Sequence, residues 1–291
     1  MGYVSPAFKE EITDAMKSYT PFTKPVKSSL LRRILVISAP VNSLHPNPED
    51  EFTDPNIGPD EEIVNDYAKK ISYSRSMLTP MPYKPLIVER ISTGGYMILN
   101  GHHRWLAAKR QGIKKLPIMI VNATHEKDVL NRMKELENSM CVSFDLDEVL
   151  ICSDATVPVD RLPFPRNLIY KWPIRKDAGS LLRELRRLGF DVWVYTGNYT
   201  APKMIQKTLK AHGGTADGII SGINLSKSNT TLKSAFSQKY KTILHIDSER
   251  ILWVNPAKKD YDSLELSGDA GWAADAISMI QKKLSEEKSN S

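Results

Sequence analysis

The sequence predicts an α/β protein of two domains: a smaller α+β domain followed by a larger domain with a parallel sheet. After residue 139, apolar runs of strand length alternate with amphipathic helical patterns, which is typical of a parallel sheet covered by helices. Before residue 123, a proline-rich loop and a helix precede two strands joined by a Gly-Gly turn, which is typical of a mixed domain. The length of 291 residues also favours two domains over one.

Composition places the chain among soluble globular proteins, with 41% hydrophobic and 25% charged residues. No apolar run reaches the roughly 18 residues of a membrane span, and the N-terminus lacks the apolar core of a signal peptide. We therefore expect a cytoplasmic protein without a membrane partner. The net charge of +6 allows an anionic partner such as nucleic acid but does not require one. Cys141 and Cys152 are expected to be small apolar side chains rather than a disulfide or a metal site.

Residues 1–33 are expected to form an N-terminal arm, with a short amphipathic segment at 7–17 and a basic, proline-broken stretch after it. The sequence leaves open whether this arm docks or stays free. A first domain is predicted over residues 34–122. It begins with a strand at 34–37, continues through a long proline-rich loop at 40–59, and then forms a helix at 61–71 capped by Asp60.

A hairpin follows, with strands at 85–91 and 96–99 that turn at Gly94-Gly95. It leads directly into Gly101-His102-His103-Arg104, at the start of an alanine-rich helix that ends at Gly112. A helix entrance presents unpaired N–H groups and the positive end of the helix dipole, so it attracts phosphate, and the histidines and the arginine would add donors there. The competing interpretation is an ordinary helix start with surface histidines and a solvated arginine.

The stretch from Leu44 to Val121 resembles the ParB/sulfiredoxin-like nucleotide-binding domain. It shares that family's Pro-Asn-Pro loop, Pro-Leu-Ile-Val strand and Gly-x-x-Arg box. The resemblance implies that Gly101, His102, His103 and Arg104 bind the phosphates of a nucleotide, with ATP, ADP and CTP as the candidates. Because sulfiredoxins carry a cysteine in this box, we do not expect reductase activity.

Two branches of this family suggest different functions. The Gly-His-His-Arg spelling is similar to the free-serine kinase branch, which implies a catalytic glutamate at Glu49, with Glu51 as the second choice. The plasmid-partition branch binds CTP and DNA, but no helix-turn-helix is predicted after the box here. Nucleic acid therefore stays an open partner.

A linker helix is predicted over residues 123–139, with Thr124 as its cap and apolar residues at helical spacing. The second domain is predicted over 140–285, followed by a polar tail at 286–291. Its strands are expected at 142–144, 190–195, 218–220 and 242–246. Helices are expected at 177–188, 201–211, 232–237 and 271–284.

Two carboxylates, Asp145 and Asp147, end the first strand of this domain. The carboxyl end of a central strand is where open α/β sheets bind ligands, and two carboxylates in one crevice call for a hard cation such as Mg²⁺. The competing interpretation is a polar loop that happens to be acidic. The sequence Asp145-Leu146-Asp147-Glu148-Val149-Leu150 resembles the first motif of the haloacid dehalogenase-like (HAD) phosphohydrolases. The strand ending at Thr196, a lysine at 233 and the strand ending at Asp247 resemble the motifs that follow.

This resemblance implies a Rossmann-like HAD fold and a role for each residue. Asp145 would be the nucleophile and Asp147 the general acid and base, while Thr196 would donate to the phosphoryl oxygens. Lys233 would offset charge, with Lys227 and Lys203 as rivals, and Mg²⁺ would be held by Asp145, Asp147 (through its backbone carbonyl) and Asp247. The fourth motif departs from the family, because Asp247 is followed by Ser248 rather than by a second acid.

No segment long enough for a cap domain interrupts these motifs, so the site should be open. The sequence therefore predicts a capless, Mg²⁺-dependent phosphatase that acts on a phosphorylated substrate, joined to a nucleotide-binding domain. A bifunctional kinase–phosphatase, with small molecules or polynucleotides as substrates, is the first alternative. A nucleotide-gated, nucleic-acid-binding protein with a non-catalytic HAD domain is the second.

Overall fold

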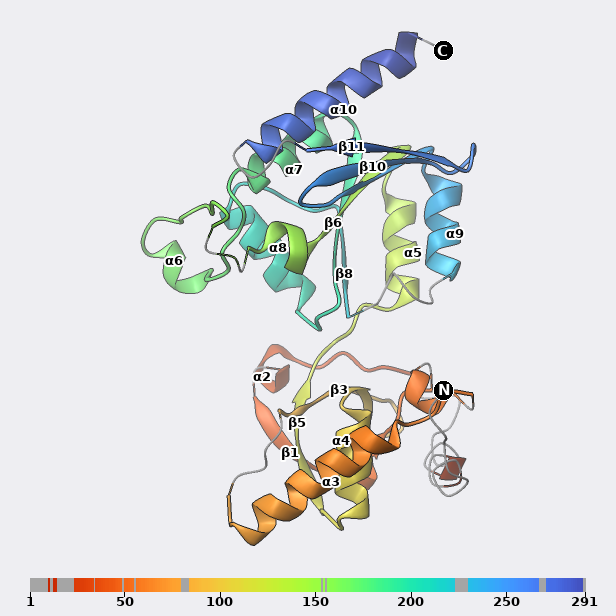
Figure 1. Ribbon diagram of the computed structural model, residues 1–291, viewed down its shortest axis with the longest axis vertical. Coiled ribbons are helices and arrows are strands. Elements are labelled where there is room, and N and C mark those ends of the chain that lie inside the picture. The colour runs from red at the N-terminus through yellow and green to blue at the C-terminus, as the bar shows by residue number, and fades with distance from the viewer. Residues whose placement is uncertain are drawn as a thin grey trace. The chain divides into compact units, whose positions relative to one another are not determined.

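The computed structural model divides into two compact units, Met1–Asn122 and Ala123–Ser291 (Figure 1). The structure describes residues 10, 13, 14 and 24–289, apart from gaps at 34, 49, 55, 80–83, 153, 155, 223–229 and 267–270. Most of the predicted amphipathic segment at 7–17 lies outside the described residues. Within the described residues, none of the helices combines the length and the apolarity that crossing a bilayer requires.

The N-terminal unit contains a five-stranded mixed sheet in the order β1-β5-β3-β4-β2. Its strands are β1 (Val36–Pro40), β2 (Leu44–His45), β3 (Leu86–Arg90), β4 (Tyr96–Asn100) and β5 (Lys115–Ile120). β3 and β4 pair antiparallel around Gly94 and Gly95, so the predicted hairpin is confirmed. The first strand begins two residues later than predicted and runs antiparallel to β5.

Two helices complete this unit, α3 (Glu61–Ser76) and α4 (His102–Arg110). Asp60 caps α3 as predicted, because its carboxylate accepts a hydrogen bond from the Ile63 N–H at 3.1 Å. The unit has its own core, in which Ile71, Ile98 and Trp105 are almost fully buried. The described end of the N-terminal arm, which includes α2 (Leu30–Arg33), is docked on this unit, since the Ser28 N–H donates to the Asn122 side chain at 2.8 Å.

The C-terminal unit contains a six-stranded sheet in the order β11-β10-β9-β6-β7-β8. Its strands are β6 (Met140–Asp145), β7 (Phe190–Thr196), β8 (Gly218–Ser221), β9 (Thr242–Ile246), β10 (Arg250–Asn255) and β11 (Asp260–Glu265). The four predicted strands, β6 to β9, are parallel. The expectation of a purely parallel sheet is wrong, because β10 returns antiparallel beside β9 and pairs with β11 in a hairpin.

Helices cover both faces of this sheet (Figure 1). One face packs on α7 (Ala178–Arg187), α8 (Pro202–Ala211) and α10 (Trp272–Ser289). The other packs on α5 (Glu126–Glu135) and α9 (Thr230–Lys239). The helix that we expected to be a linker is therefore part of the second unit's core. The last helix continues to Ser289, so most of the expected polar tail is helical.

The two cysteines are free, and Cys141 is fully buried in the core cluster under α5 and α9. Burial raises the pKa of its thiol well above the ordinary range, as expected of a small apolar side chain in a core.

Candidate functional site

The strand order of the second sheet reverses at β6, and we call the carboxyl ends of β6 and β9 the crevice. From β6 the chain passes to β7 on one side, whereas β9 lies on the other side of β6. Open α/β sheets bind ligands where the strand order reverses in this way. Asp145 is the last residue of β6, and Asp247 follows β9 directly. Phe144 pairs with Ile246, so the two aspartates follow neighbouring positions of adjacent parallel strands.

Asp145 caps the turn that follows β6. This turn, η3 (Leu146–Leu150), is π-helical. One carboxylate oxygen of Asp145 accepts hydrogen bonds from the N–H groups of Asp147 at 2.7 Å and Glu148 at 2.9 Å. These two bonds fix the Asp145 carboxylate at the edge of the sheet while its second oxygen has no partner among the described residues. The same bonds fold the backbone of Asp147 back over the strand end.

Thr196 ends β7, the strand beside β6, and its side chain is completely buried. Its hydroxyl donates to the Asp147 carboxylate at 2.5 Å and accepts from the Asn198 N–H at 3.0 Å. We expected this hydroxyl to donate to phosphoryl oxygens. In the structure it holds the side chain of Asp147 instead, because η3 turns that carboxylate toward the end of β7.

The crevice carries strong negative charge. Burial raises the pKa of Asp145, and the charges of Asp147 and Asp247 raise it further, against the opposing effect of the two N–H bonds to its carboxylate. The pKa of Tyr195 is raised to about 12 by burial and by the charges of Asp145, Glu148 and Asp247. In the part of the chain that the structure describes, none of the three aspartates forms an ion pair with a lysine or an arginine.

Clustered carboxylates without a counterion, with hard oxygen donors, are suited to a divalent cation such as Mg²⁺. However, the described residues contain no group of three or more His, Cys, Asp or Glu side chains placed to hold a metal ion. The set of three carboxylates at Asp145, Asp147 and Asp247 is therefore not assembled, because Thr196 holds the carboxylate of Asp147. The carboxylates of Asp145 and Asp247 and the backbone carbonyl of Asp147 are the oxygen donors that fit the ion.

The lysine assignment is not resolved by these contacts. Lys233 lies on α9 and Lys203 on α8, and both residues are exposed. Lys227 lies outside the described residues. The role of Lys233 therefore stays a prediction.

The predicted phosphate-binding box of the N-terminal unit lines a cleft of about 280 Å³. The cleft is lined by Asp50, Ile63, Tyr67, Leu99, Asn100, Gly101, His102, His103 and Arg104. Gly101 is the N-cap of α4 and has φ of +106°. Because glycine has no side chain, no side-chain hydrogen bond caps this helix. A Cβ atom at Gly101 would lie 2.7 Å from the Arg104 guanidinium, which explains why glycine is needed here.

The two histidines of the box bind the protein's own backbone. His102 is buried, stacks on Phe52 with ring centroids 5.1 Å apart, and accepts a hydrogen bond from the Asn47 N–H at 3.1 Å. Burial lowers its pKa to about 4, so the ring is neutral. His103 accepts from the Asp60 N–H at 3.0 Å, and burial lowers its pKa as well. Sequence reasoning missed this role, which holds the proline-rich loop against the start of α4.

Arg104 is also engaged by the protein. Its guanidinium donates to the Lys84 carbonyl at 2.5 Å and to the Asn100 side chain at 2.8 Å. Arg104 also lines the cleft, and the expectation that it binds phosphate stays a prediction. Glu49, the predicted catalytic glutamate, lies outside the described residues.

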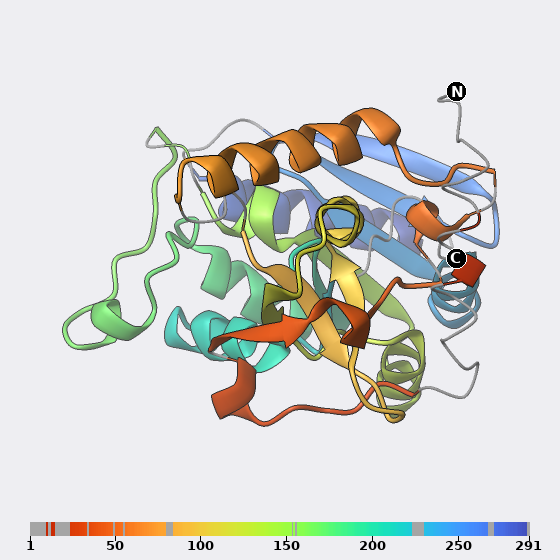
Figure 2. The same ribbon diagram turned by 90° about the horizontal axis from the view of Figure 1, so that it is seen from below.

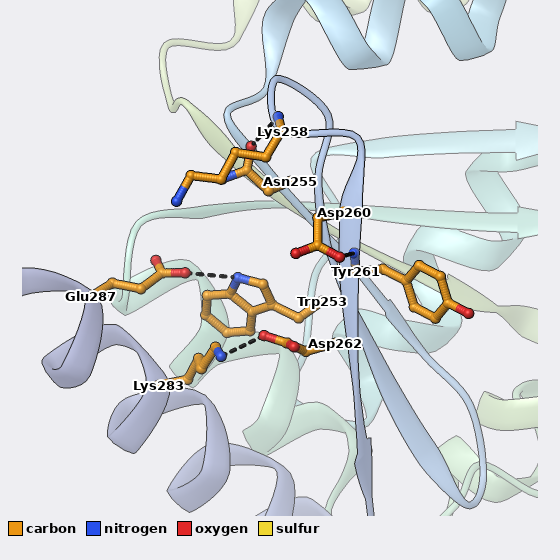
Figure 3. A pocket seen from close by; sticks show the side chains of 8 residues that line it. All are labelled: Trp253, Asn255, Lys258, Asp260, Tyr261, Asp262, Lys283 and Glu287. Atoms are coloured by element: carbon orange, nitrogen blue, oxygen red, sulfur yellow. Dashed lines mark hydrogen bonds and ion pairs between the residues drawn. The ribbon is translucent and has the colours of Figure 1, made fainter. Parts of the chain in front are cut away.

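A second cleft of about 370 Å³ separates the β10–β11 hairpin from α10 (Figure 3). Two of its polar contacts join the hairpin to the helix. Lys283 pairs with Asp262 at 2.5 Å, and the Trp253 indole donates to Glu287 at 3.1 Å. None of the predicted site residues lines this cleft. These contacts fix α10 against the edge of the sheet.

The first unit is a mixed-sheet domain in which a helix without a side-chain cap begins beside a cleft. Residues 37–139 match a family model described as the ParB N-terminal domain, so this part of the chain is similar to that domain. This match continues past the first unit and through α5.

The chain is also similar to parts of two ParB proteins and to a free serine kinase. A 37-residue stretch is 46% identical to a probable chromosome-partitioning protein ParB of Vibrio cholerae, and covers 13% of each chain. The crystal structure of ParB from Caulobacter crescentus with CTP-gamma-S is 30% identical over 33% of this chain and 49% of that one, with a TM-score of 0.25. A free serine kinase with AMP is 12% identical over 84% of this chain and 96% of that one, with a TM-score of 0.24. The chain spans less than half the length of the ParB proteins it matches.

Proposed function

We propose that the chain is a nucleotide-binding protein whose N-terminal unit binds a nucleoside triphosphate at the N-terminus of α4. The observation that carries this proposal is the match of residues 37–139 to the ParB N-terminal domain, on a unit whose cleft ends at an uncapped helix start. The backbone N–H groups and the helix dipole would contact the phosphates. His102 and His103 would hold the loop that forms the opposite wall of the cleft.

CTP is the first nucleotide to test, because the ParB of Caulobacter crescentus was crystallised with CTP-gamma-S. Asp50 lines the same cleft, so a divalent cation brought with the nucleotide would offset its charge. Calorimetric titration of the full chain with CTP, ATP and ADP, each with Mg²⁺, tests the proposal. Saturable binding of at least one of them is expected, and no binding of any would contradict it.

Nucleic acid is the partner that this family suggests, since a second Caulobacter ParB structure contains the parS site. The net charge of +6 is compatible with such a partner. Binding to duplex DNA that weakens steeply with salt and changes when CTP is added would support a nucleotide-gated function. DNA binding of equal affinity with and without CTP would contradict a nucleotide-gated function.

For the C-terminal unit we propose phosphate monoester hydrolysis in the crevice between β6 and β9. The specific observation that favours it is that Asp145, Thr196 and Asp247 stand at the ends of neighbouring parallel strands, with Thr196 holding the Asp147 carboxylate beside them. Asp145 would attack phosphorus while Asp147 gives its proton to the departing oxygen, which leaves an aspartyl-phosphate. Asp147 would then take a proton from the water that attacks phosphorus, and this step releases phosphate and restores Asp145.

Mg²⁺ bound to Asp145 and Asp247 would neutralise charge on the phosphate. Thr196 holds the Asp147 carboxylate in one orientation through both steps. The test is hydrolysis of a generic aryl phosphate by the full chain with Mg²⁺. We expect Asp145→Asn to abolish turnover and Asp260→Asn, at an exposed aspartate on β11, to leave it unchanged. Equal activity in both variants would exclude the proposed nucleophile.

The kinase alternative stays a prediction. Nucleotide turnover that is lost in Glu49→Gln but kept in Asp145→Asn would support it over hydrolysis in the crevice.

A further inference from the structure

An arm projects from the C-terminal unit beside the crevice. It consists of residues 152–175 and carries the short helix α6 (Arg166–Ile169). Figures 1 and 2 both show the loop around α6 standing out from the helices that cover the sheet. The structure describes this arm except at residues 153 and 155.

The base of the arm is fixed next to the catalytic turn. Ile151 bridges to Ile174, and the Arg175 N–H donates to the carbonyl of Leu150, the last residue of η3, at 2.9 Å. The Arg175 guanidinium stacks on Trp272 at 4.2 Å. Both ends of the arm therefore meet at Leu150 and Ile151, the first of which lies five residues after Asp145.

Apolar side chains at the tip of the arm face solvent. Phe164 is 78% exposed, Leu168 is 60% exposed and Ile169 is 65% exposed. Together with Leu35, Val36, Leu78 and Tyr261, they are among the most exposed large hydrophobic residues that the structure describes. These three residues lie within six positions of the chain, and we call them the apolar patch; so much exposure in one short segment exceeds the scattered single hydrophobic residues that are normal on a protein surface.

Positive charge accompanies this patch. Between Asp160 and Asp177 the chain has no acidic residue, whereas it has five basic ones: Arg161, Arg166, Lys171, Arg175 and Lys176. Arg175 is buried at the base, and the other four are exposed. An exposed aromatic ring among basic side chains suits a single-stranded nucleic acid, because bases stack on the ring while phosphates meet the cations.

We propose that this arm docks a single-stranded nucleic acid whose terminal phosphate enters the crevice at Asp145. The inference rests on the proposed hydrolase function and names its substrate class. Phe164 would stack on a base near the phosphorylated end, and Arg161, Arg166 and Lys171 would contact the phosphates behind it. The four-residue helix is too short to form an amphipathic membrane anchor, and the absence of acids across sixteen residues matches a polyanion.

The experiment compares two substrates in the full chain: a generic aryl phosphate and a short single-stranded oligonucleotide with a terminal phosphate. Phe164→Ala and the triple variant Arg161→Glu/Arg166→Glu/Lys171→Glu should keep aryl phosphate turnover. On the oligonucleotide we expect KM to rise about tenfold for Phe164→Ala, the loss of one stacked base. For the triple variant, the slope of the logarithm of the binding constant against the logarithm of the salt concentration should become shallower by about 2, since each lost phosphate contact accounts for about 0.7.

Matched controls are Tyr261→Ala, at another exposed aromatic, and Lys282→Glu, at an exposed lysine on α10; neither should change oligonucleotide binding. Oligonucleotide binding measured by fluorescence anisotropy in Asp145→Asn separates the two proposals. Arm-dependent binding together with no turnover of either substrate by the wild type would overturn the hydrolase and keep the docking. Aryl phosphate turnover together with oligonucleotide binding that is unchanged in the arm variants would overturn the docking. Arm-dependent binding to anionic vesicles or to a phosphopeptide, without binding to the oligonucleotide, would overturn it as well.

Discussion

The hydroxyl of Thr196 donates a hydrogen bond to the carboxylate of Asp147 across the ends of β7 and η3, at 2.5 Å. The two residues are 49 positions apart in the chain. Thr196 is completely buried, so this bond forms away from solvent, where a lost partner costs more than it does at a surface. The bond fixes the proposed acid and base relative to the proposed nucleophile, whose own carboxylate is held by the same turn.

Thr196→Val should therefore lower aryl phosphate turnover while the shape of the site is kept. Without the hydroxyl, Asp147 can rotate away from the leaving oxygen, so we expect kcat to fall about 10- to 100-fold, a partial loss of the roughly 100- to 10,000-fold that general acid–base catalysis contributes. KM should change little. Thr208→Val, at another buried threonine on α8, is the matched control and should keep full activity. Equal loss in both variants would mean that Thr196 has no special role.

The stability of the N-terminal unit should depend on pH through His102. Burial lowers the pKa of His102 from its ordinary value of 6.5 to about 4 in the folded chain, so the unit is most stable above about pH 6.5, where the ring is neutral in both states. As pH falls from 6.5 toward 4, the unfolded chain takes up a proton that the folded ring cannot. The unit should then lose on the order of 3 kcal/mol of unfolding free energy.

Urea unfolding of the wild type and His102→Gln at several pH values measures this effect. The variant should be less stable at pH 7 because it loses the fit against Phe52, and its decline toward pH 4 should be shallower. Parallel pH profiles for the two proteins would show that His102 is not the titrating group.

Gly101→Ala should destabilise the N-terminal unit more than Gly94→Ala does. Both glycines have positive φ, so each substitution costs about 1–2 kcal/mol for the backbone alone. At Gly101 the new Cβ would also lie 2.4 Å from a Leu86 methyl group and 2.7 Å from the Arg104 guanidinium, whereas nothing lies within 4 Å at Gly94. Thermal unfolding of the two variants compares them, and equal losses would rule out the steric argument at the box.

Tyr240→Phe should destabilise the C-terminal unit by about 1–3 kcal/mol, since it removes one member of a buried hydrogen-bond network. The Tyr240 hydroxyl donates to Asp191 at 2.9 Å and accepts from the Trp193 indole at 3.1 Å. Tyr261→Phe, at a tyrosine that is 69% exposed, should change unfolding by only a few tenths of a kcal/mol. A Tyr240→Phe variant as stable as the Tyr261→Phe variant would contradict this account of the network.

Much of the fold could be predicted from local pattern. The apolar runs that become β6, β7 and β9 are buried on both faces, so they stand out in the sequence. β11 was missed because it is almost entirely exposed and polar, so it lacks the alternation that identifies a strand, whereas the apolar run of β10, with Ile251 and Trp253 buried, was a signal that could have identified it. The position of β11 is set by pairing with β10, a tertiary effect that no short window contains.

The candidate site was predictable to a similar degree. A rule about strand ends places Asp145, Thr196 and Asp247 at one edge of the sheet. The direction of each side chain was not predictable, because it depends on η3, which turns Asp147 toward Thr196. The backbone contacts of the two histidines of the box were not predictable from local sequence either. Their partners, the N–H groups of Asn47 and Asp60, are more than 40 residues away.

The central claim is that a nucleotide binds in the cleft at the start of α4. It is tested most directly by measuring nucleotide binding in full-length variants that carry an added charge at the rim of this cleft. Ile63 lines the cleft from α3 and is 43% exposed, so Ile63→Glu adds a negative charge there without disturbing the core. Tyr73→Glu adds the same charge to an exposed position on the same helix that does not line the cleft. In calorimetric titrations with CTP and Mg²⁺, we predict that affinity falls at least tenfold in Ile63→Glu and stays near wild type in Tyr73→Glu. Equal affinity in all three proteins, or no binding by the wild type, would contradict a nucleotide site at this helix entrance.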